Sequence, residues 1–195
     1  MGIASFSGAS SVIKPGVVTS STRPSAPFVG QLIYDTTVAQ TLAWNGSAWI
    51  GAAGKIGQVQ STFKADAFST TSTSFVDVTG LSVSITPIAT TSRVLIMAYI
   101  ASAGSTTNDY YMNLNRDSTA ICQTTSGSTI STARGFVSGA MTLYTTVVFL
   151  DSPSTTSSTT YKIQGRAGSD TMYVNRRGAD TLGSTSTITV MEVLA

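Results

Sequence analysis

The part of the sequence that most limits the possible folds is residues 56–195, a succession of short segments rich in β-branched and aromatic residues. Examples are "SFVDV", "RVLIMAYI", "DYYMNLNR" and "STITVMEVL", separated by turn clusters such as "SAGSTTND" and "DSPSTTSSTT". No segment has the 3.6-residue apolar period of an amphipathic helix. Many short strands with frequent turn signals are typical of an antiparallel sandwich or jelly roll. The sequence therefore predicts an all-β protein in which residues 65–195 form a jelly-roll head domain of the β-sandwich type.

Two of the predicted strands carry apolar residues on both faces. In residues 93–100 the second face includes Met97 and Tyr99, and in residues 141–150 it includes Tyr144. A sandwich strand in a monomer normally exposes one face to water. A second apolar face predicts burial against another subunit, and we expect a homotrimer with Tyr99 and Tyr144 in the trimer interface. The alternative is that a loop of the same chain covers these strands.

A small β-meander is predicted over residues 23–54, before the head domain. Its strongest signal is Asn45-Gly46, which favours a two-residue hairpin turn that pairs Trp44 with Ser47. A meander of this size is not stable alone in water if it has an apolar aromatic face. That face must pack on the rest of the chain, on further copies or on a larger assembly. The predicted attachment residues are Tyr34, Leu42, Trp44 and Trp49.

The segments on either side of the meander are predicted to contain no regular secondary structure. Residues 1–22 are small and nearly uncharged, and we expect an extended attachment segment that a partner holds in place. Residues 55–64 are expected to be a linker to the head. The N-terminal residues lack the basic region and apolar run of a secretion signal, so release by host lysis is the expected route to the outside of a cell.

The sequence is poor in residues that perform catalysis. It has no histidine, which excludes His-based triads and imidazole metal sites. Glu192 is the single glutamate and is expected to point outward, whereas a glycoside hydrolase needs two carboxylates that face one bond. Most aspartates, among them Asp35 and Asp151, are expected to be solvated turn or cap residues. We therefore expect no catalytic residue, no metal site and no cofactor.

Charge and hydropathy limit the partners. The net charge is +2 with scattered arginines, which gives no basic patch for a nucleic acid. The longest apolar run, residues 94–101, is far shorter than the roughly 20 residues of a membrane-spanning helix. We expect neither nucleic acid binding nor membrane insertion. Cys122 is the single cysteine and is expected to be a small buried residue.

Two stretches resemble structural proteins of tailed bacteriophages of the tail-fibre type. The first, "RPSAPFVGQLIYDTTVAQTLAWNGSAW", resembles a short module of the form R-P-x-x-P-x-x-G-Q-x-I-Y-[DE]-T followed by x-L-x-W-N-G-S-A-W. The second combines "TSFVDVTGLSVSITPIATTSRVLI", "LNRDSTAI" and "STITVMEV", and resembles the jelly-roll tip domains of phage fibres, which are similar to trimeric C1q/TNF-type heads. Together the stretches span about residues 20–195, and the chain departs from long fibres because it has no extended shaft. The matching residues of the first stretch are Arg23, Pro24, Pro27, Gly30, Gln31, Ile33, Tyr34, Asp35, Thr36, Leu42, Trp44, Asn45, Gly46 and Trp49.

The resemblance implies a non-enzymatic virion protein, assembled in the host cytoplasm and exposed on the particle surface. The expected form is a homotrimeric short tail fibre that is anchored by its N-terminus and carries a C-terminal host-recognition head. The expected partners are further copies of the chain, tail, baseplate or capsid proteins, and a polysaccharide or protein of the host surface. The main alternative is a capsid decoration or head-fibre protein that binds the shell; a tailspike depolymerase and a bacterial adhesin are less favoured.

If the head recognises a host, its contact residues should lie in loops at one end of the sandwich. Two stretches fit, "SAGSTTNDYYMN" and "YVNRRG", because aromatic rings suit sugars and arginines suit phosphate or carboxylate groups. The alternative is that the tyrosines are core residues and the arginines only solvate a turn. The predicted receptor-binding residues are Asp109, Tyr110, Tyr111, Tyr173, Asn175, Arg176 and Arg177.

Overall fold

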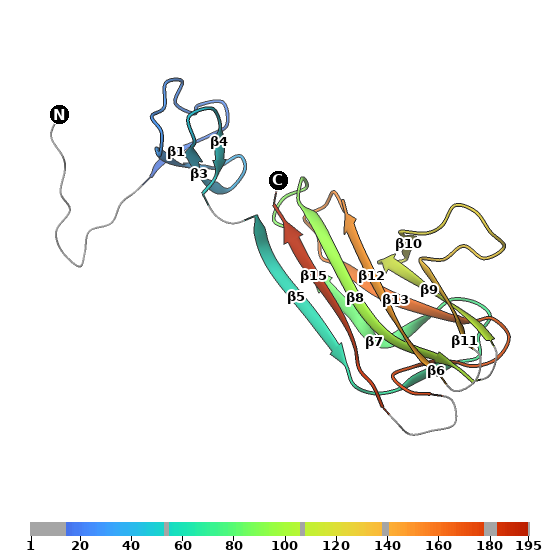
Figure 1. Cartoon of the computed structure of the whole chain (residues 1–195). Helices are drawn as coiled ribbons and strands as arrows, with labels where there is room; N and C mark the ends of the chain where they lie inside the picture. The colour runs from blue at the N-terminus through green and yellow to red at the C-terminus, as the bar shows by residue number, and fades with distance from the viewer. Residues whose placement is uncertain (1–14, 53–54, 106–107, 138–140, 178–182, 195) are drawn as a thin grey trace. The chain divides into compact units, whose positions relative to one another are not determined.

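A computed structural model describes residues 15–52, 55–105, 108–137, 141–177 and 183–194 of the chain. Within these residues the secondary structure consists of β-strands alone, β1 to β15 (Figure 1). The predicted all-β class is therefore confirmed. The chain divides between Lys55 and Ile56 into two compact units, here called the N-terminal unit and the head.

The N-terminal unit is a four-stranded sheet in the order β1-β2-β3-β4. Its strands are β1 (Gly16–Val18), β2 (Leu32–Asp35), β3 (Gln40–Trp44) and β4 (Trp49–Gly51). Strands β2 to β4 form the antiparallel meander that the sequence predicts, whereas β1 pairs in parallel with β2. The segment 1–22 is thus not only an extended attachment segment, because residues 16–18 belong to the sheet; residues 1–14 lie outside the described part.

The hairpin between β3 and β4 differs from the predicted one by two residues in register. Trp44 lies opposite Trp49, not Ser47, and residues 45–48 form a four-residue loop. The Asn45 side chain explains the longer loop: its Oδ1 accepts hydrogen bonds from the backbone N–H groups of Ser47 (2.9 Å) and Ala48 (2.8 Å). A shift of two residues leaves the alternation of side chains unchanged, so both tryptophans still share a face.

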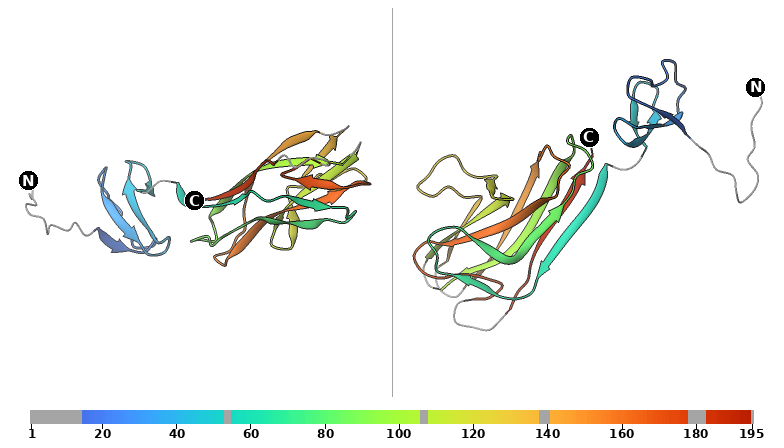
Figure 2. Two further views of the ribbon diagram at one scale, coloured as in Figure 1. Left: turned by 90° about the horizontal axis from the view of Figure 1, so that it is seen from below. Right: turned by 180° about the vertical axis from the view of Figure 1, so that it is seen from behind.

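The head is a sandwich of two antiparallel sheets that lie face to face (Figure 2). One sheet, here the six-stranded sheet, has the order β5-β15-β8-β14-β6, with β12 also paired to β8. Its strands are β5 (Ile56–Lys64), β6 (Phe68–Thr70), β8 (Arg93–Gly104), β12 (Thr142–Asp151), β14 (Met172–Val174) and β15 (Ser186–Val193).

The other sheet, here the five-stranded sheet, has the order β10-β9-β13-β7, with β11 also paired to β9. Its strands are β7 (Val76–Ile85), β9 (Asn108–Arg116), β10 (Thr119–Ile121), β11 (Ala133–Val137) and β13 (Thr159–Ala167). The core lies between the sheets and is made of alternate apolar side chains, such as Val94, Ile96 and Ile100 of β8 against Ile163 of β13.

The predicted linker at 55–64 is wrong, because this segment forms β5. Its nine residues pair along the edge of β15, with Phe63 opposite Thr187 and Val59 opposite Met191. The two-residue period of this strand is weak in the sequence, because Ser61 interrupts the apolar face between Val59 and Phe63. Between Gly51, where β4 ends, and Ile56, where β5 begins, the described residues are Ala52 and Lys55.

Two acidic residues that the sequence places in solvent lie in the interior. Glu192 points inward, and its carboxylate accepts hydrogen bonds from the Ile88 backbone N–H (2.7 Å) and Gln58 Nε2 (2.8 Å). Asp151 accepts hydrogen bonds from the Tyr161 hydroxyl (2.7 Å) and Arg116 Nη1 (2.9 Å). Burial of a carboxylate requires such partners. Both acids are therefore fully engaged in the fold, and burial together with Asp151 raises the pKa of Tyr161.

Candidate interaction surfaces

The outer face of the six-stranded sheet, across β5, β15, β8 and β12, carries no charged side chain at its central positions. The register places the residues of these strands in rows. Four of the large apolar ones are exposed, namely Val59, Phe63 (64%), Tyr99 and Val148 (60%), and the others are half-buried. We call this surface the neutral face. Its residues are Val59, Ser61, Phe63, Leu95, Met97, Tyr99, Thr146, Val148, Leu150, Thr187, Thr189 and Met191.

Both predicted interface tyrosines are accessible at the neutral face. Tyr99 lies in it, and Tyr144 at its border stacks on Tyr99 with ring centroids 5.3 Å apart and an interplanar angle of 13°. Their exposure contradicts the alternative in which a loop of the same chain covers these strands, as far as the described residues extend. The apolar second face that the sequence predicts is therefore present in the described part of the head.

The predicted attachment residues of the N-terminal unit do not form one surface. Leu42 is buried against Ile33 in a small core of the unit, and the rings of Trp44 and Trp49 pack together at a centroid distance of 5.5 Å. Tyr34 points to the opposite side of the sheet, because it neighbours the buried Ile33 along β2.

That opposite side carries several exposed apolar residues that the sequence reasoning missed. Val17 lies beside Tyr34, and Leu32 and Ile50 flank Ala43 in the next row. We call this surface the outer module face. The alternation of Leu32 and Tyr34 around Ile33 was the available signal. Its exposed large residues are Val17, Leu32, Tyr34 and Ile50.

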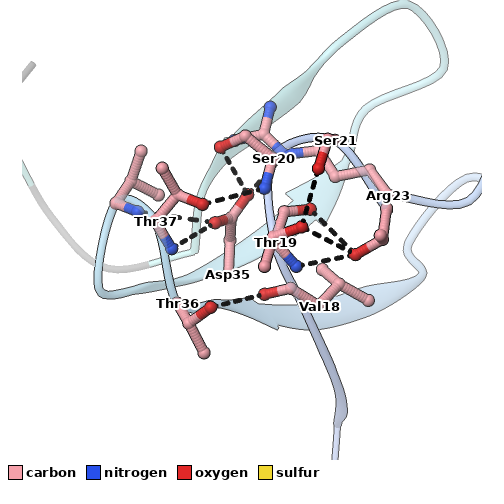
Figure 3. A network of polar contacts seen from close by, with 10 residues as sticks. Val18, Thr19, Ser20, Ser21, Arg23, Asp35, Thr36 and Thr37 are labelled. Atoms are coloured by element: carbon pink, nitrogen blue, oxygen red, sulfur yellow. Dashed lines mark hydrogen bonds and ion pairs between the residues drawn. The ribbon is translucent and has the colours of Figure 1, made fainter.

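A buried carboxylate fixes the segment before β2 to the sheet (Figure 3). Asp35 accepts hydrogen bonds from Arg23 Nε (2.6 Å), the Ser20 hydroxyl (3.1 Å) and the Thr37 backbone N–H (2.8 Å). Burial raises the pKa of Asp35, but these bonds and one from Val38 outweigh it, and the net effect lowers the pKa. Arg23 and Asp35 both lie in the stretch that gave the sequence resemblance, and this ion pair gives them a structural role.

Replacing Asp35 by Asn is expected to unfold the N-terminal unit at neutral pH, because the Arg23 charge loses its partner. Wild type should show the same transition on acidification. Since folding lowers the pKa of Asp35, its contribution is complete above about pH 4, the pKa of an unfolded aspartate, and is lost as the pH falls through the folded value. Tryptophan fluorescence measures this transition, because both tryptophans, Trp44 and Trp49, lie in this unit.

The matched control is Asp77→Asn, which removes one carboxylate charge from the head. Asp77 pairs with Lys162 (2.8 Å), and its replacement should leave the tryptophan signal unchanged. If Asp35→Asn has the fluorescence and pH profile of wild type, the buried ion pair does not hold the unit together.

Two of the predicted receptor-binding residues are buried, and their assignment as contact residues is wrong. Tyr110 is 0% exposed, and its hydroxyl accepts a hydrogen bond from the Ser102 hydroxyl (2.9 Å). Asn175 Nδ2 donates to the backbone carbonyls of Lys64 (2.9 Å) and Asp66 (3.0 Å). Burial raises the pKa of Tyr110. Tyr110 is a core residue, which is the alternative that the sequence left open for the tyrosines, whereas Asn175 holds the backbone of residues 64 and 66.

The remaining predicted receptor residues lie on different sheets. Tyr173 is on β14 of the six-stranded sheet, and the Arg176 guanidinium lies 4.8 Å from its ring centroid. Arg176 Nε donates to the Arg177 carbonyl (3.2 Å). Asp109 and Tyr111 are on β9 of the five-stranded sheet. The two stretches therefore do not combine into a single site.

Tyr111 lies between two arginines that the sequence reasoning did not select. Arg134 of β11 and Arg166 of β13 are its direct neighbours in the sheet, with guanidinium carbons 6.0 and 5.1 Å from the ring centroid. Asp109 Oδ1 accepts from both Nε (2.9 Å) and Nη2 (2.7 Å) of Arg134. Only the long-range register of three strands brings these residues together, so no local signal predicted the cluster.

A cleft opens beside this cluster, under the loop between β10 and β11 that projects from the sheet in Figure 1. Its volume is about 360 Å³, within the usual range for small-ligand sites. Hydroxyl side chains dominate its wall. The lining residues are Tyr111, Thr124, Ser126, Gly127, Ser128, Thr129, Ser131, Thr132, Ala133 and Arg134.

Within the described ranges, no three His, Cys, Asp or Glu side chains gather closely enough to hold a metal ion. The same residues include no helix with the length and hydropathy needed to cross a membrane. Cys122 is half-buried, and burial raises the pKa of its thiol.

No protein-family model matches the chain, and a search of curated proteins gives no match. Solved structures of infectious bursal disease virus share a low likeness with it. A Gt-strain structure has 12% identity and a TM-score of 0.43 over 88% of this chain and 46% of that chain. The T13 viral particle has 13% identity and a TM-score of 0.41 over 77% and 39%. The chain thus spans less than half the length of these proteins.

Proposed function

We propose that the chain is a non-enzymatic structural protein of a virus particle, which self-associates as a homotrimer through the neutral face. The observation that carries the proposal is this face itself, an apolar surface over four strands with exposed apolar residues on β5, β8 and β12 and no charge at its centre. Interfaces of obligate homo-oligomers are more apolar than other surfaces. An uncharged surface also suits a second copy of itself, since like charges would otherwise meet across the symmetry axis.

The resemblance of residues 20–195 to phage fibre proteins supports the choice of a trimer and of a phage particle. In this proposal the N-terminal unit anchors the protein and the head faces outward as a short tail fibre that contacts the host. The direct test is the mass in solution by light scattering. Three times 20.2 kDa is expected for the full chain, and a stable monomer would contradict the proposal.

The outer module face is the proposed contact with another virion protein. Its exposed apolar residues, Val17, Leu32, Tyr34 and Ile50, lie on a unit whose own small core is already filled by Ile33 and Leu42. Trp44 and Trp49, which the sequence favours, pack on each other and border that core. A neighbouring structural protein with an apolar surface is the partner that fits this face.

Replacing Leu32 and Ile50 together by Glu is expected to remove the protein from assembled particles, because two carboxylates would be buried at the contact. The trimer mass should not change. The measurement compares the amount of the protein in purified particles for the variant and wild type. Val38→Glu, a change at an exposed apolar residue in the β2–β3 turn, is the matched control and should assemble normally. Equal incorporation of the double variant would show that attachment uses another surface.

A capsid decoration protein is the second candidate, and the short connection between the two units favours it. Strand β4 ends at Gly51 and β5 begins at Ile56, which leaves no room for a fibre shaft between the N-terminal unit and the head. Antibodies against the exposed loop around Ser152 and Ser157 distinguish the candidates by electron microscopy. Labelled tails support the fibre, and labelled shells support the decoration protein.

A further inference from the structure

We propose that the cleft beside Tyr111 binds an acidic saccharide, a pyranose that bears a carboxylate, with Arg166 as the residue that selects the acid. The inference deepens the host-recognition part of the proposed function. It rests on that proposal only for the origin of the sugar at a cell surface.

The cluster beside the cleft has one positive charge in excess. Arg134 is compensated by Asp109 through two hydrogen bonds to one carboxylate oxygen. Arg166 forms no ion pair with any residue in the described part of the chain. A half-buried guanidinium without a carboxylate is a site for an anion, and carboxylate is one of the two groups that match its geometry.

The hydrogen bonds of Arg166 are also incomplete. Its Nη1 donates to the Thr129 hydroxyl over 3.3 Å, which is long for such a bond, and its Nε is buried with no partner among the described residues. A buried donor without a partner, such as this Nε, destabilises the free protein. Binding of a carboxylate is therefore favoured if the Arg166 side chain rearranges to donate hydrogen bonds to it. Thr129 and Tyr111 both line the cleft, so Arg166 contacts two of its lining residues.

The other lining groups suit the hydroxyls of a sugar. Ser126 and Ser128 line the cleft, and their side-chain hydroxyls have no hydrogen-bond partner among the residues that the structure describes. A hydroxyl is both donor and acceptor and can pair with a sugar hydroxyl in either direction. The Tyr111 ring is less suited to stack on a sugar, because arginines lie against it from both neighbouring strands. The cleft is therefore a polar, cationic site and not an aromatic platform.

The test is ligand-observed saturation-transfer NMR on the full chain with two probes that differ only in the acid, methyl β-glucuronide and methyl β-glucoside. The glucuronide is expected to bind about tenfold more tightly, the effect of one charge-assisted hydrogen-bonded pair. Equal binding of the two probes would overturn the role of the acid. Acetate that competes as well as the glucuronide at equal concentration would overturn the saccharide and leave a simple anion site.

The variant Arg166→Gln should remove the preference for the glucuronide. Lys162→Gln is the matched control, because it removes one positive charge from the same strand and the same sheet face, and its preference should match wild type. Retention of the preference in Arg166→Gln contradicts the inference. If Arg166→Gln fails to fold, the double variant Ser126→Ala/Ser128→Ala is tested instead, because it changes only two exposed loop hydroxyls. Its affinity for both probes should be lower than that of wild type. Unchanged affinity would overturn the site.

The outcome is separable from that of the proposed function, because the mass of the same samples is measured by light scattering. A monomer that binds the glucuronide would contradict the homotrimer and leave this inference intact. A trimer that binds neither probe would contradict the inference alone.

Discussion

Replacing Val148 by Arg is expected to convert the trimer into a monomer. Val148 lies in the neutral face on its border strand β12, between Thr146 and Leu150 and opposite Met97 of β8. Burial of an unpaired guanidinium in an apolar interface costs about 3 kcal/mol or more. Because each 1.4 kcal/mol or so changes a dissociation constant tenfold, the constant should rise by more than a hundredfold. Size-exclusion chromatography with light scattering measures the change.

The matched control is Ile88→Arg, which introduces the same charge at an exposed apolar residue in the connection between β7 and β8. Ile88 is not part of the neutral face, so this variant should remain a trimer. Circular dichroism should show the same β signal for both variants, because Val148 points away from the core. A Val148→Arg protein with the wild-type mass would place the subunit contact elsewhere.

Much of the fold follows from local sequence pattern, because alternation and turn chemistry act over a few residues. The doubly apolar segment 93–100 is a clear example: its two faces are the core face and the neutral face of β8. The local pattern gave wrong predictions where a residue far along the chain determines the structure. Residues 56–64 form β5 because they pair with the edge of β15. Glu192 points inward because Gln58 and the Ile88 N–H donate hydrogen bonds to its carboxylate.

The candidate surfaces were less predictable, for the same reason. Tyr110 and Tyr111 are neighbours on one strand, so their side chains must point to opposite faces, and only one of them is available to a ligand. The local sequence does not say which, because both are tyrosines. The choice depends on the residue opposite on β11, which is Gly135 for Tyr110 and Arg134 for Tyr111. Arg166 joins the cluster from a third strand, far along the chain.

Replacing Gly135 by Ala is expected to destabilise the head strongly. The Tyr110 ring occupies the space above this glycine, and a Cβ at Gly135 would overlap Tyr110 Cζ and the hydroxyl oxygen. The ring is 0% exposed and cannot move aside without loss of its Ser102 bond. Overpacking of this kind costs roughly 3 kcal/mol, which for a domain of this size lowers the melting temperature by roughly 6 to 12 °C.

The matched control is Gly183→Ala, since a Cβ at Gly183 meets no atom within 4 Å and the head should melt as in wild type. A second comparison isolates the contact with the ring. In a Tyr110→Ala background the same Gly135→Ala change should cost far less, because the clash is gone, and residues in direct contact are expected to be non-additive in this way. Equal costs in the two backgrounds would mean that Gly135 is required for its backbone and not for the ring above it. The smaller cost would show that this glycine directs Tyr110 into the core and so leaves Tyr111 as the residue presented at the cleft.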